Sequence, residues 1–259
     1  MSILKLENEN LIIKKDRRVL LKNINLTVEK GDKILFSGIN GAGKSTLFKT
    51  LLGFIAEDGD AYAKLEGGTY SFCDSNDLRD LNQHIIYISQ EDFIGKPFTK
   101  VRKAFLEAIP DEISDKRKYF SSWEEKYKPF LQDDLSKKLI EKRIFQLSGG
   151  EKKFVAIIQS LLRCDLDSVK LAMIDEPVNN LDAKHVRQLS DLLTRIQFYN
   201  PDFSIILITH CHAFPKITKS YEVTSEKELK TVDYQVHNCF GSFDNDGFYQ
   251  KKMNPKVTE

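Results

Sequence analysis

The sequence predicts an α/β fold with a mainly parallel β-sheet at its centre. Short apolar runs that are typical of buried strands alternate with helical patterns along most of the chain. A glycine-rich turn follows the first of these runs and leads directly into a helical pattern. The strand-like runs lie at residues 33–37, Ile85–Ile88, 171–174 and 204–209. We therefore expect a sheet covered on both faces, with ligand-binding groups at the carboxyl ends of its strands.

Two parts of the chain depart from this alternation. Near the N-terminus, apolar and polar side chains alternate, for example at Ile24, Leu26 and Val28, and a basic turn at residues 14–18 predicts an antiparallel hairpin. From about residue 92 to 144 the pattern is helical and charged, so we interpret this stretch as an inserted helical subdomain with a solvated Lys and Glu face. Its expected packing points are Phe105, Trp123, Phe130, Leu131 and Leu135.

Length and composition narrow the class of protein. A chain of 259 residues fits one α/β domain, 1–259, with a core at 1–90 and about 161–259 and a helical subdomain at about 91–160. With 39 basic and 38 acidic residues, the net charge of +1 argues against nucleic acid binding driven by bulk charge. The apolar runs are far shorter than the roughly 18–20 residues of a membrane helix. The N-terminus carries no secretory signal, so we expect a cytoplasmic protein.

The four cysteines predict neither a disulfide framework nor a zinc site. Cys73, Cys164, Cys211 and Cys239 lie far apart and form no CxxC pair, so we expect reduced thiols. A cluster of two histidines and a cysteine at residues 210–212 lacks a second ligand pair at a usual spacing, which disfavours a metal there.

The strongest local signal is the glycine-rich turn at residues 38–46. It fits the pattern G-x-x-x-x-G-K-[ST] between a predicted strand and a predicted helix, as a phosphate-binding loop requires. Such glycines let successive backbone N–H groups face phosphate oxygens, while Lys44 reaches the β- and γ-phosphates and Ser45 can place its hydroxyl on Mg²⁺. The predicted nucleotide-binding residues are Gly38, Asn40, Gly41, Ala42, Gly43, Lys44, Ser45 and Thr46.

Two carboxylates end the predicted strand at residues 171–174. Because the carboxyl ends of parallel strands meet at one edge of a sheet, Asp175 and Glu176 are expected beside the phosphate loop. Asp175 is predicted to hold Mg²⁺, commonly through water, and Glu176 to orient and deprotonate an attacking water. The sequence therefore favours a nucleotide site that can hydrolyse its ligand.

A second phosphate-facing turn precedes the helical pattern at residues 152–162. Its residues are Leu147, Ser148, Gly149, Gly150 and Glu151, and two glycines before a helix make another anion-binding N-terminus. A second nucleotide is the simplest reason for two such surfaces in one small domain. With these motifs in this order over nearly the whole chain, the sequence closely resembles the ATP-binding cassette (ABC) ATPases. In that family the LSGG(Q/E) signature of one subunit closes over ATP held by the phosphate loop of the other.

The resemblance implies roles for further residues. Gln90 matches the Q-loop glutamine, which in the family contacts Mg²⁺ and the attacking water and moves with the helical subdomain. His210 matches the switch histidine that contacts the γ-phosphate, and residues 179–182 match the D-loop that crosses the dimer interface. The implied catalytic residues are Glu176, His210 and Gln90, the implied Mg²⁺ ligands are Ser45, Gln90 and Asp175, and the implied D-loop residues are Asn180, Leu181 and Asp182.

Three positions depart from the family pattern. No aromatic residue precedes Phe36, so the tyrosine that usually stacks on adenine has no equivalent, and we hypothesise that a cation of the basic turn at 14–18 packs on the base instead. Phe154 stands where the family often has a basic residue, and the D-loop has two asparagines at 179–180. None of these changes removes the phosphate-loop lysine, the two acids or the histidine, so we expect a hydrolytically competent site.

The resemblance also implies a function and partners. A chain with one phosphate loop and one signature must pair, as a homodimer or as a heterodimer with another ABC subunit, around two ATP molecules and Mg²⁺. The leading interpretation is the ATP-binding subunit of an ABC transporter on the cytoplasmic face of the membrane, with residues 91–99 contacting a separate transmembrane permease subunit and no nucleic acid partner. The alternative is a soluble ABC ATPase of the iron–sulfur assembly type, because LSGGEKK resembles its signature region. A regulatory module without turnover is disfavoured by the intact catalytic set.

Overall fold

A computed structural model describes most of the chain. The described residues are 2–13, 18–52, 62–65, 68–71, 84–89, 94–134, 139–163, 169–179, 181–211, 213–234, 242–243 and 249–250. Several residues singled out in the sequence lie outside them, namely Lys14, Lys15, Arg17, Cys73, Gln90, Leu135, Cys164, Asn180, His212 and Cys239. The side chains of Arg18, Phe130 and Leu131 are likewise not described, so the roles predicted for them stay predictions.

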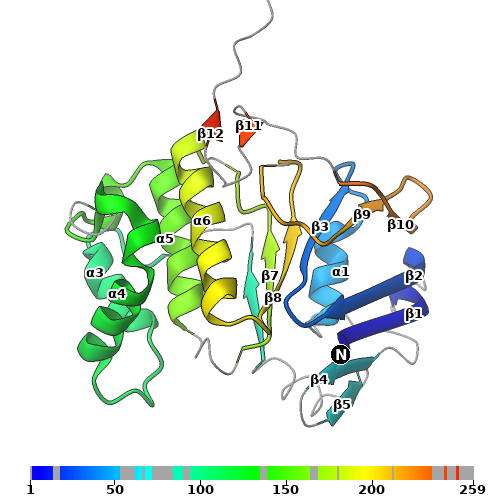
Figure 1. Cartoon of the computed structure of the whole chain (residues 1–259), viewed down its shortest axis with the longest axis horizontal. Helices are drawn as coiled ribbons and strands as arrows, with labels where there is room; N and C mark the ends of the chain where they lie inside the picture. Colours follow the sequence, from blue (N-terminus) through cyan, green and yellow to red (C-terminus); the bar gives the residue numbers. More distant parts are fainter. Residues whose placement is uncertain are drawn as a thin grey trace, which may run out of the picture.

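A mainly parallel sheet forms the centre of the molecule (Figure 1). Among the described residues its strand order is β10-β9-β3-β8-β7-β6, and every neighbouring pair is parallel except β9 with β10. The strands are β3 (Lys33–Gly38), β6 (Ile85–Ile88), β7 (Leu171–Asp175), β8 (Ser204–Ile208), β9 (Lys219–Val223) and β10 (Leu229–Thr231). The four apolar runs of the sequence are confirmed as strands, with ends that shift by one residue at most.

An antiparallel sheet lies beside the parallel one. It is ordered β2-β1-β4-β5 and contains β1 (Ser2–Ile13), β2 (Arg18–Glu29), β4 (Tyr62–Leu65) and β5 (Gly68–Ser71). The predicted hairpin is confirmed as β1 and β2, with Leu6 opposite Leu26. Sequence reasoning missed β4 and β5, which have four residues each and no long apolar run.

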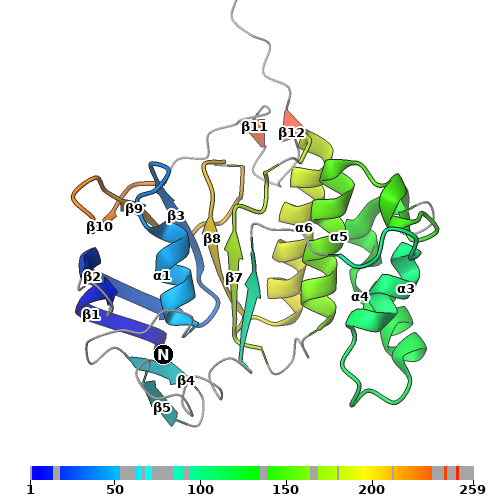
Figure 2. The same ribbon diagram turned by 180° about the vertical axis from the view of Figure 1, so that it is seen from behind.

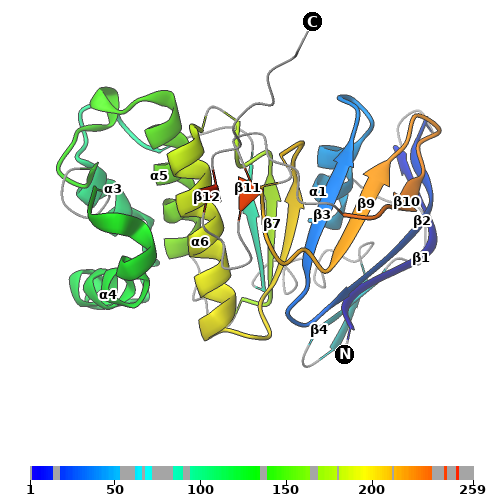
Figure 3. The same ribbon diagram turned by 45° about the horizontal axis from the view of Figure 1, so that its top comes forward.

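The helices lie on both sides of the parallel sheet. Seen from behind in Figure 2, α1 packs between β3 and the antiparallel sheet, while α5 and α6 lie side by side and α3 and α4 form the outer end. Figure 3 places α3 and α4 at one end of the molecule and β1 and β2 at the other. The helices are α1 (Lys44–Leu51), α3 (Val101–Ala108), α4 (Lys116–Asp134), the short 3-10 helix η2 (Ile144–Gln146), α5 (Gly149–Leu162) and α6 (Ala183–Tyr199).

Two apolar cores explain why the central strands are continuously apolar. Along β8, Ile205 and Leu207 belong to the core under α5 and α6, whereas Ile206 and Ile208 belong to the core under α1 and the antiparallel sheet. Both faces of the strand are therefore buried, and each such side chain stabilises the fold by about 1.5–3 kcal/mol relative to exposure. Phe105 and Trp123 are buried in the first core, as predicted.

The chain continues beyond the parallel sheet into a short hairpin. Its strands are β11 (Ser242–Phe243) and β12 (Tyr249–Gln250), which pair antiparallel. In the described part of the chain, no helix combines the length and the apolar character that a bilayer crossing requires.

Candidate nucleotide site

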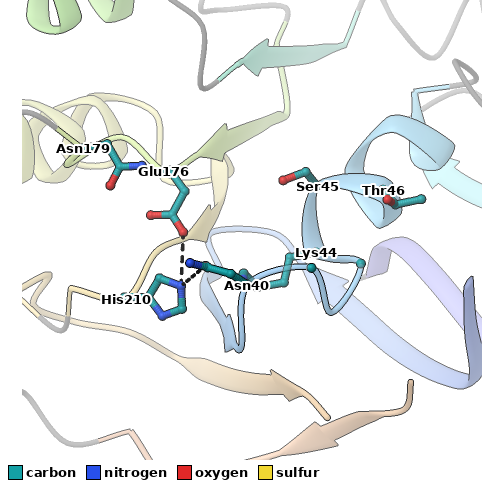
Figure 4. Close-up of a pocket in the computed structure, with 9 residues that line it drawn as sticks. Asn40, Lys44, Ser45, Thr46, Glu176, Asn179 and His210 are labelled. Carbon is teal, nitrogen blue, oxygen red and sulfur yellow. Dashed lines mark hydrogen bonds and ion pairs between the residues drawn. The ribbon is translucent and has the colours of Figure 1, made fainter. Parts of the chain in front are cut away.

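The carboxyl ends of three neighbouring strands bring the predicted residues together. Phe36 of β3 and Asp175 of β7 both lie opposite Ile208 of β8 in the sheet register. The phosphate loop follows β3, the two acids end β7 and His210 follows β8, so all three groups reach one edge of the sheet. A pocket of about 410 Å³ opens there (Figure 4), lined by Asn40, Gly41, Gly43, Lys44, Ser45, Thr46, Glu176, Asn179 and His210.

The phosphate loop turns tightly between β3 and α1. Gly38 has a φ of +125°, and a Cβ there would lie 2.4 Å from the carbonyl oxygen of Val223 on β9, so the strand end requires glycine. The Lys44 ammonium is buried and donates to the carbonyl oxygens of Gly38 at 2.7 Å and Ile39 at 3.1 Å. Burial lowers the pKa of Lys44 below its usual value, and the nearby carboxylates of Glu176 and Asp175 offset only part of this shift. The lysine therefore lies inside the loop that phosphate groups would enter.

Asp175 is buried, and only one of its two carboxylate oxygens accepts a hydrogen bond among the described residues. The Tyr87 hydroxyl of β6 donates to Oδ2 at 3.4 Å. Oδ1 has no hydrogen-bond partner among the described residues, although Asp175 is only 2% exposed. Because a buried carboxylate oxygen without a partner is costly, this donor set fits the Mg²⁺ that the sequence predicts there.

Tyr87 is a site residue that sequence reasoning missed. It lies on the neighbouring strand β6, opposite Met173 in the register, and its ring also contacts Phe48 of α1. No motif marks it. The only signal in the sequence is a hydroxyl-bearing side chain inside an otherwise apolar strand, which must find a polar partner when it is buried.

Glu176 is held in a backbone conformation that glutamate rarely adopts. Its φ is +46°, in the left-handed region, and its N–H donates to the carbonyl oxygen of Ile208 at 2.8 Å. Burial raises the pKa of Glu176 and the Asp175 carboxylate adds to the rise, while Lys44 and Lys153 oppose it. A partly buried carboxylate whose pKa is raised is a stronger base than one in water, which suits it to accept a proton.

His210 faces Glu176 across the pocket (Figure 4). Its Nε2 lies 3.6 Å from Oε1 of Glu176 and 3.2 Å from Oδ1 of Asn40, so it bridges the second acid and the phosphate loop. The ring is half exposed toward the pocket, with 51% of the side chain accessible. Cys211, next to it, is buried.

The signature residues lie apart from this pocket. Ser148 is the N-cap of α5, and its hydroxyl accepts from the Glu151 N–H at 3.2 Å. Glu151 in turn accepts from the Ser148 N–H at 2.9 Å and from Lys142 at 2.6 Å. Burial acts to raise the pKa of Glu151, but these hydrogen bonds outweigh it and hold the pKa below its usual range. Leu147 is buried, whereas Ser148 and Gly149 are exposed on the surface, and none of the five lines the pocket.

The described part of the D-loop caps helix α6 and approaches the signature helix. Leu181 is buried, and Asp182 accepts from the His185 N–H at 2.9 Å and lies 2.8 Å from its ring Nδ1. The His185 ring contacts Phe154 of α5, with centroids 6.0 Å apart. Phe154, which stands where the family often has a basic residue, is fully buried in this contact.

A mainly parallel sheet with a glycine-rich loop between a strand and a helix, a lysine within the loop and two acids at the carboxyl end of another strand of the same sheet defines a P-loop ATPase. Within that class, residues 21–179 match the family model described as ABC transporter. The nickel import system ATP-binding protein NikD of Staphylococcus aureus strain N315 is 31% identical over 215 residues, covering 78% of this chain and 77% of NikD. The chain therefore belongs to the ABC transporter family, whose ATP-binding subunits hydrolyse ATP to power transport through membrane-spanning subunits.

Solved structures show the same fold. A dimeric ATP-binding cassette in a post-hydrolysis state with ADP and phosphate has a TM-score of 0.67 at 18% identity, covering 90% of this chain and 99% of that one. CbiO1 from Clostridium perfringens, part of the ABC transporter complex CbiONQ, has a TM-score of 0.65 at 23% identity, covering 88% of this chain and 87% of CbiO1. The first of these cassettes is a dimer, and the second is part of a transporter complex.

Proposed function

We propose that this chain forms a face-to-face dimer, with itself or with another ABC subunit, in which two ATP molecules lie between the phosphate loop of one subunit and the signature of the other. The convergence of Lys44, Glu176 and His210 on one pocket carries this proposal. The signature supports it because Ser148 and Gly149 are exposed and far enough from the pocket that they do not line it. Each site is therefore incomplete within one chain, and a second copy supplies the missing phosphate ligands.

The residues of the pocket divide the work of hydrolysis. Lys44 and the N–H groups at the start of α1 bind the phosphates, and their positive charge stabilises the transition state. Ser45, Asp175 and Gln90 would hold Mg²⁺, which would neutralise phosphate charge. Glu176 accepts the proton of the attacking water, and His210, held at 3.2 Å from Asn40, fixes the geometry around Glu176 and the γ-phosphate.

We further propose that the core, residues 1–90 and about 161–259, holds ATP, while the helical subdomain, about 91–160, carries the signature and meets a membrane-spanning partner on the cytoplasmic face. A second pocket, of about 510 Å³, supports this contact. It is lined by Ile94, Gly95, Ala104, Glu107, Ala108, Ile109, Pro110, Asp111, Gln159 and Arg163. The lining begins at Ile94, directly after residues 91–93. Its mixture of apolar and charged side chains suits the end of an amphipathic helix from a separate permease subunit.

Co-purification tests this proposal. Tagged Glu176→Gln protein is isolated from its native cells with Mg²⁺-ATP in mild detergent, beside a matched preparation of Ala108→Arg, which fills the second pocket with a long charged side chain. We expect a stoichiometric polytopic membrane protein to co-purify with the Glu176→Gln protein. The same membrane protein should be lost from the Ala108→Arg preparation. Only soluble partners, or the chain alone, would instead favour the iron–sulfur assembly class.

A further inference from the structure

Two phenylalanine rings lie together on the surface of the helical subdomain. Phe98 is 74% exposed and Phe145 is 53% exposed, and their ring centroids are 5.5 Å apart. Phenylalanine is among the residues most often buried, so two adjacent exposed rings differ from the scattered apolar side chains of an ordinary surface. We call Phe98 and Phe145 the aromatic patch. Such a patch indicates a surface that contacts another molecule.

The two segments that carry the rings, residues 96–103 and 139–146, are tied to each other along their backbones. An antiparallel bridge joins them, and the Phe145 N–H donates to the carbonyl oxygen of Pro97 at 2.9 Å. Ile144 is buried, whereas the residues on either side of it are exposed. The backbone pairing therefore holds the aromatic patch on the outer face of the subdomain.

Basic side chains flank the aromatic patch. The two segments contain six basic residues and one acidic residue, which are Lys96, Lys100, Arg102, Lys103, Lys142, Arg143 and Glu141. Glu141 is shared by Lys100 and Arg102, at 2.8 Å and 4.0 Å, and two further cations pair with acids of α3 and α5. Lys96 and Arg143 are exposed and have no acidic partner in the part of the chain that the structure describes. The surface around the rings is therefore positively charged, in a chain whose net charge is only +1.

The shape and the charge of this surface favour a lipid bilayer over a protein segment. Peptides usually bind in a groove or along a sheet edge, whereas Phe98 projects into solvent and neither ring lines the nucleotide pocket or the second pocket. Exposed aromatic rings enter the boundary between lipid headgroups and acyl chains, and Lys and Arg side chains beside them attract anionic lipids. The first segment leads into α3, which lies at the end of the molecule away from β1 and β2 (Figure 3).

We infer that the aromatic patch and the basic side chains that flank it form a membrane-binding surface, which contacts the anionic headgroups of a lipid bilayer. The inference rests on the proposed function, because a membrane-spanning partner at the helical subdomain brings this surface next to a bilayer. The permease occupies the second pocket, which begins at Ile94, and the lipid headgroups contact the chain from Lys96 onward. The helical subdomain is then held at the membrane by a protein and by lipid at two adjacent places.

Sedimentation of the purified full chain with lipid vesicles tests this inference. Vesicles of phosphatidylglycerol and phosphatidylcholine are compared with vesicles of phosphatidylcholine alone, and we expect binding to the first that weakens as salt is added. Lys96→Gln combined with Arg143→Gln should weaken this binding by about tenfold to thirtyfold, because each cation near an anionic surface contributes roughly fivefold. Phe98→Ser combined with Phe145→Ser should weaken it by about tenfold or more.

Matched substitutions elsewhere on the surface are the controls. Phe198→Ser removes a ring that is 78% exposed at the end of α6, far along the chain from both segments. Lys216→Gln combined with Lys230→Gln removes two exposed cations and therefore the same net charge as the Lys96 and Arg143 pair. Both control proteins should bind phosphatidylglycerol vesicles as the parent does.

Lipid binding and permease binding can fail separately. A parent chain that does not sediment with phosphatidylglycerol vesicles, or that sediments equally with phosphatidylcholine alone, would overturn the inference, while a co-purifying membrane protein would leave the proposed function intact. Vesicle binding that both double substitutions weaken would support the inference even if no membrane protein co-purifies, and that second result would count against the proposed function alone.

Two further results would also overturn the membrane-binding surface. One is equal vesicle binding by the parent and both double variants. The other is loss of the co-purifying permease from the Phe98→Ser and Phe145→Ser protein when the parent binds no vesicles, which would assign the aromatic patch to the permease. Thermal unfolding shows whether each variant is folded, and the Lys96 and Arg143 variant carries the test if the aromatic variant does not fold.

Discussion

The two ends of strand β3 differ in how their polar groups are satisfied. At the amino end, Asp32 is buried and fully bonded, since it accepts from the Thr218 hydroxyl at 2.8 Å, the Glu29 N–H at 2.8 Å and Lys219 at 2.7 Å. Next to it, Lys33 donates to Thr194 and to a backbone carbonyl. At this end the charges hold β2, β3 and β9 together.

The carboxyl end of the same strand leads into the nucleotide pocket, where polar groups are left for a ligand. Lys44 is bonded only to carbonyls of its own loop in the described contacts, Asp175 keeps one buried oxygen without a described partner, and Glu176 has a left-handed backbone. Strain and unsatisfied groups of this kind persist where function requires them. Substitutions at the pocket should therefore change activity more than stability. Substitutions at the amino end of β3 should change stability more than activity.

The largest expected effect is on turnover at the pocket. Glu176→Gln removes the proton acceptor and keeps the shape, so kcat should fall by about 10²–10⁴-fold while ATP still binds and the thermal unfolding midpoint stays unchanged. Phosphate release measures kcat, and thermal unfolding measures the midpoint. Glu226→Gln, an exposed acid in the β9–β10 turn, is the control. Turnover near the parent rate would remove Glu176 from its proposed role.

The next largest effect is on stability at the amino end of β3. Burial, with a contribution from Lys216, lowers the pKa of Lys33 to about 8. The folded state therefore releases this proton more easily than the unfolded state, and stability rises with pH between about 8 and 10.5. Below pH 8 the buried charge of Lys33 destabilises the fold by up to about 3 kcal/mol, so Lys33→Met should raise the unfolding free energy at pH 7. The variant should also lose the increase in stability between about pH 8 and 10.5.

Denaturant unfolding across this pH range measures the effect. Lys219→Met is the contrasting variant, because it leaves Asp32 without its ammonium partner and should destabilise the fold. A Lys33→Met protein that is less stable at pH 7, or that keeps the parent slope above pH 8, would contradict the account of this end of the strand.

A smaller effect is expected for Lys44→Met. Loss of a charge-assisted hydrogen bond to phosphate should weaken ATP binding by about tenfold to a hundredfold, with no loss of stability because the ammonium is partly desolvated. Titration calorimetry with ATP measures the affinity. Lys49→Met, on the exposed side of α1, should bind ATP like the parent, and equal weakening in both variants would show a general charge effect instead.

The smallest effect is expected at Tyr87. Tyr87→Phe removes the hydroxyl that donates to Asp175 and keeps the ring against Phe48. Because the bond is long, the half-saturating Mg²⁺ concentration for ATP-dependent dimer formation in the Glu176→Gln background should rise by only about two- to fivefold. An unchanged Mg²⁺ requirement would show that Asp175 is oriented without Tyr87.

Much of the fold and site could be predicted from the sequence because strong local signals coincide with shared geometry. Continuous apolar runs mark strands buried on both faces. Because parallel strands present their carboxyl ends together, the runs that precede Lys44, Asp175 and His210 are enough to place these residues at one edge of the sheet. The predicted residues of the phosphate loop follow from the pattern G-x-x-x-x-G-K-[ST] between a strand and a helix.

What could not be predicted depends on tertiary contacts that leave no local pattern. No local pattern predicts that the side chains of Lys33 and Lys153 are buried, yet both are 1% exposed. Tyr87 and Gln159 belong to no motif. The contact of Tyr87 with Asp175 and that of Gln159 with the Ala104 carbonyl appear only when β6 lies beside β7 and α5 beside α3. The strands β4 and β5 are too short for a periodic signal.

The most direct test of the central claim is the mass of the Glu176→Gln protein in solution with and without Mg²⁺-ATP, by size-exclusion chromatography with light scattering. For a homodimer, we expect the mass of a single chain without nucleotide and twice that mass with Mg²⁺-ATP. Ser148→Arg, which blocks the exposed signature, should abolish the change. If no other ABC subunit is required, a single chain at saturating Mg²⁺-ATP and high protein concentration would contradict the proposed dimer. If co-purification finds a second ABC subunit, the same measurement on the mixture tests for a heterodimer. A mixture in which both subunits keep the mass of single chains with Mg²⁺-ATP would contradict the proposal in full.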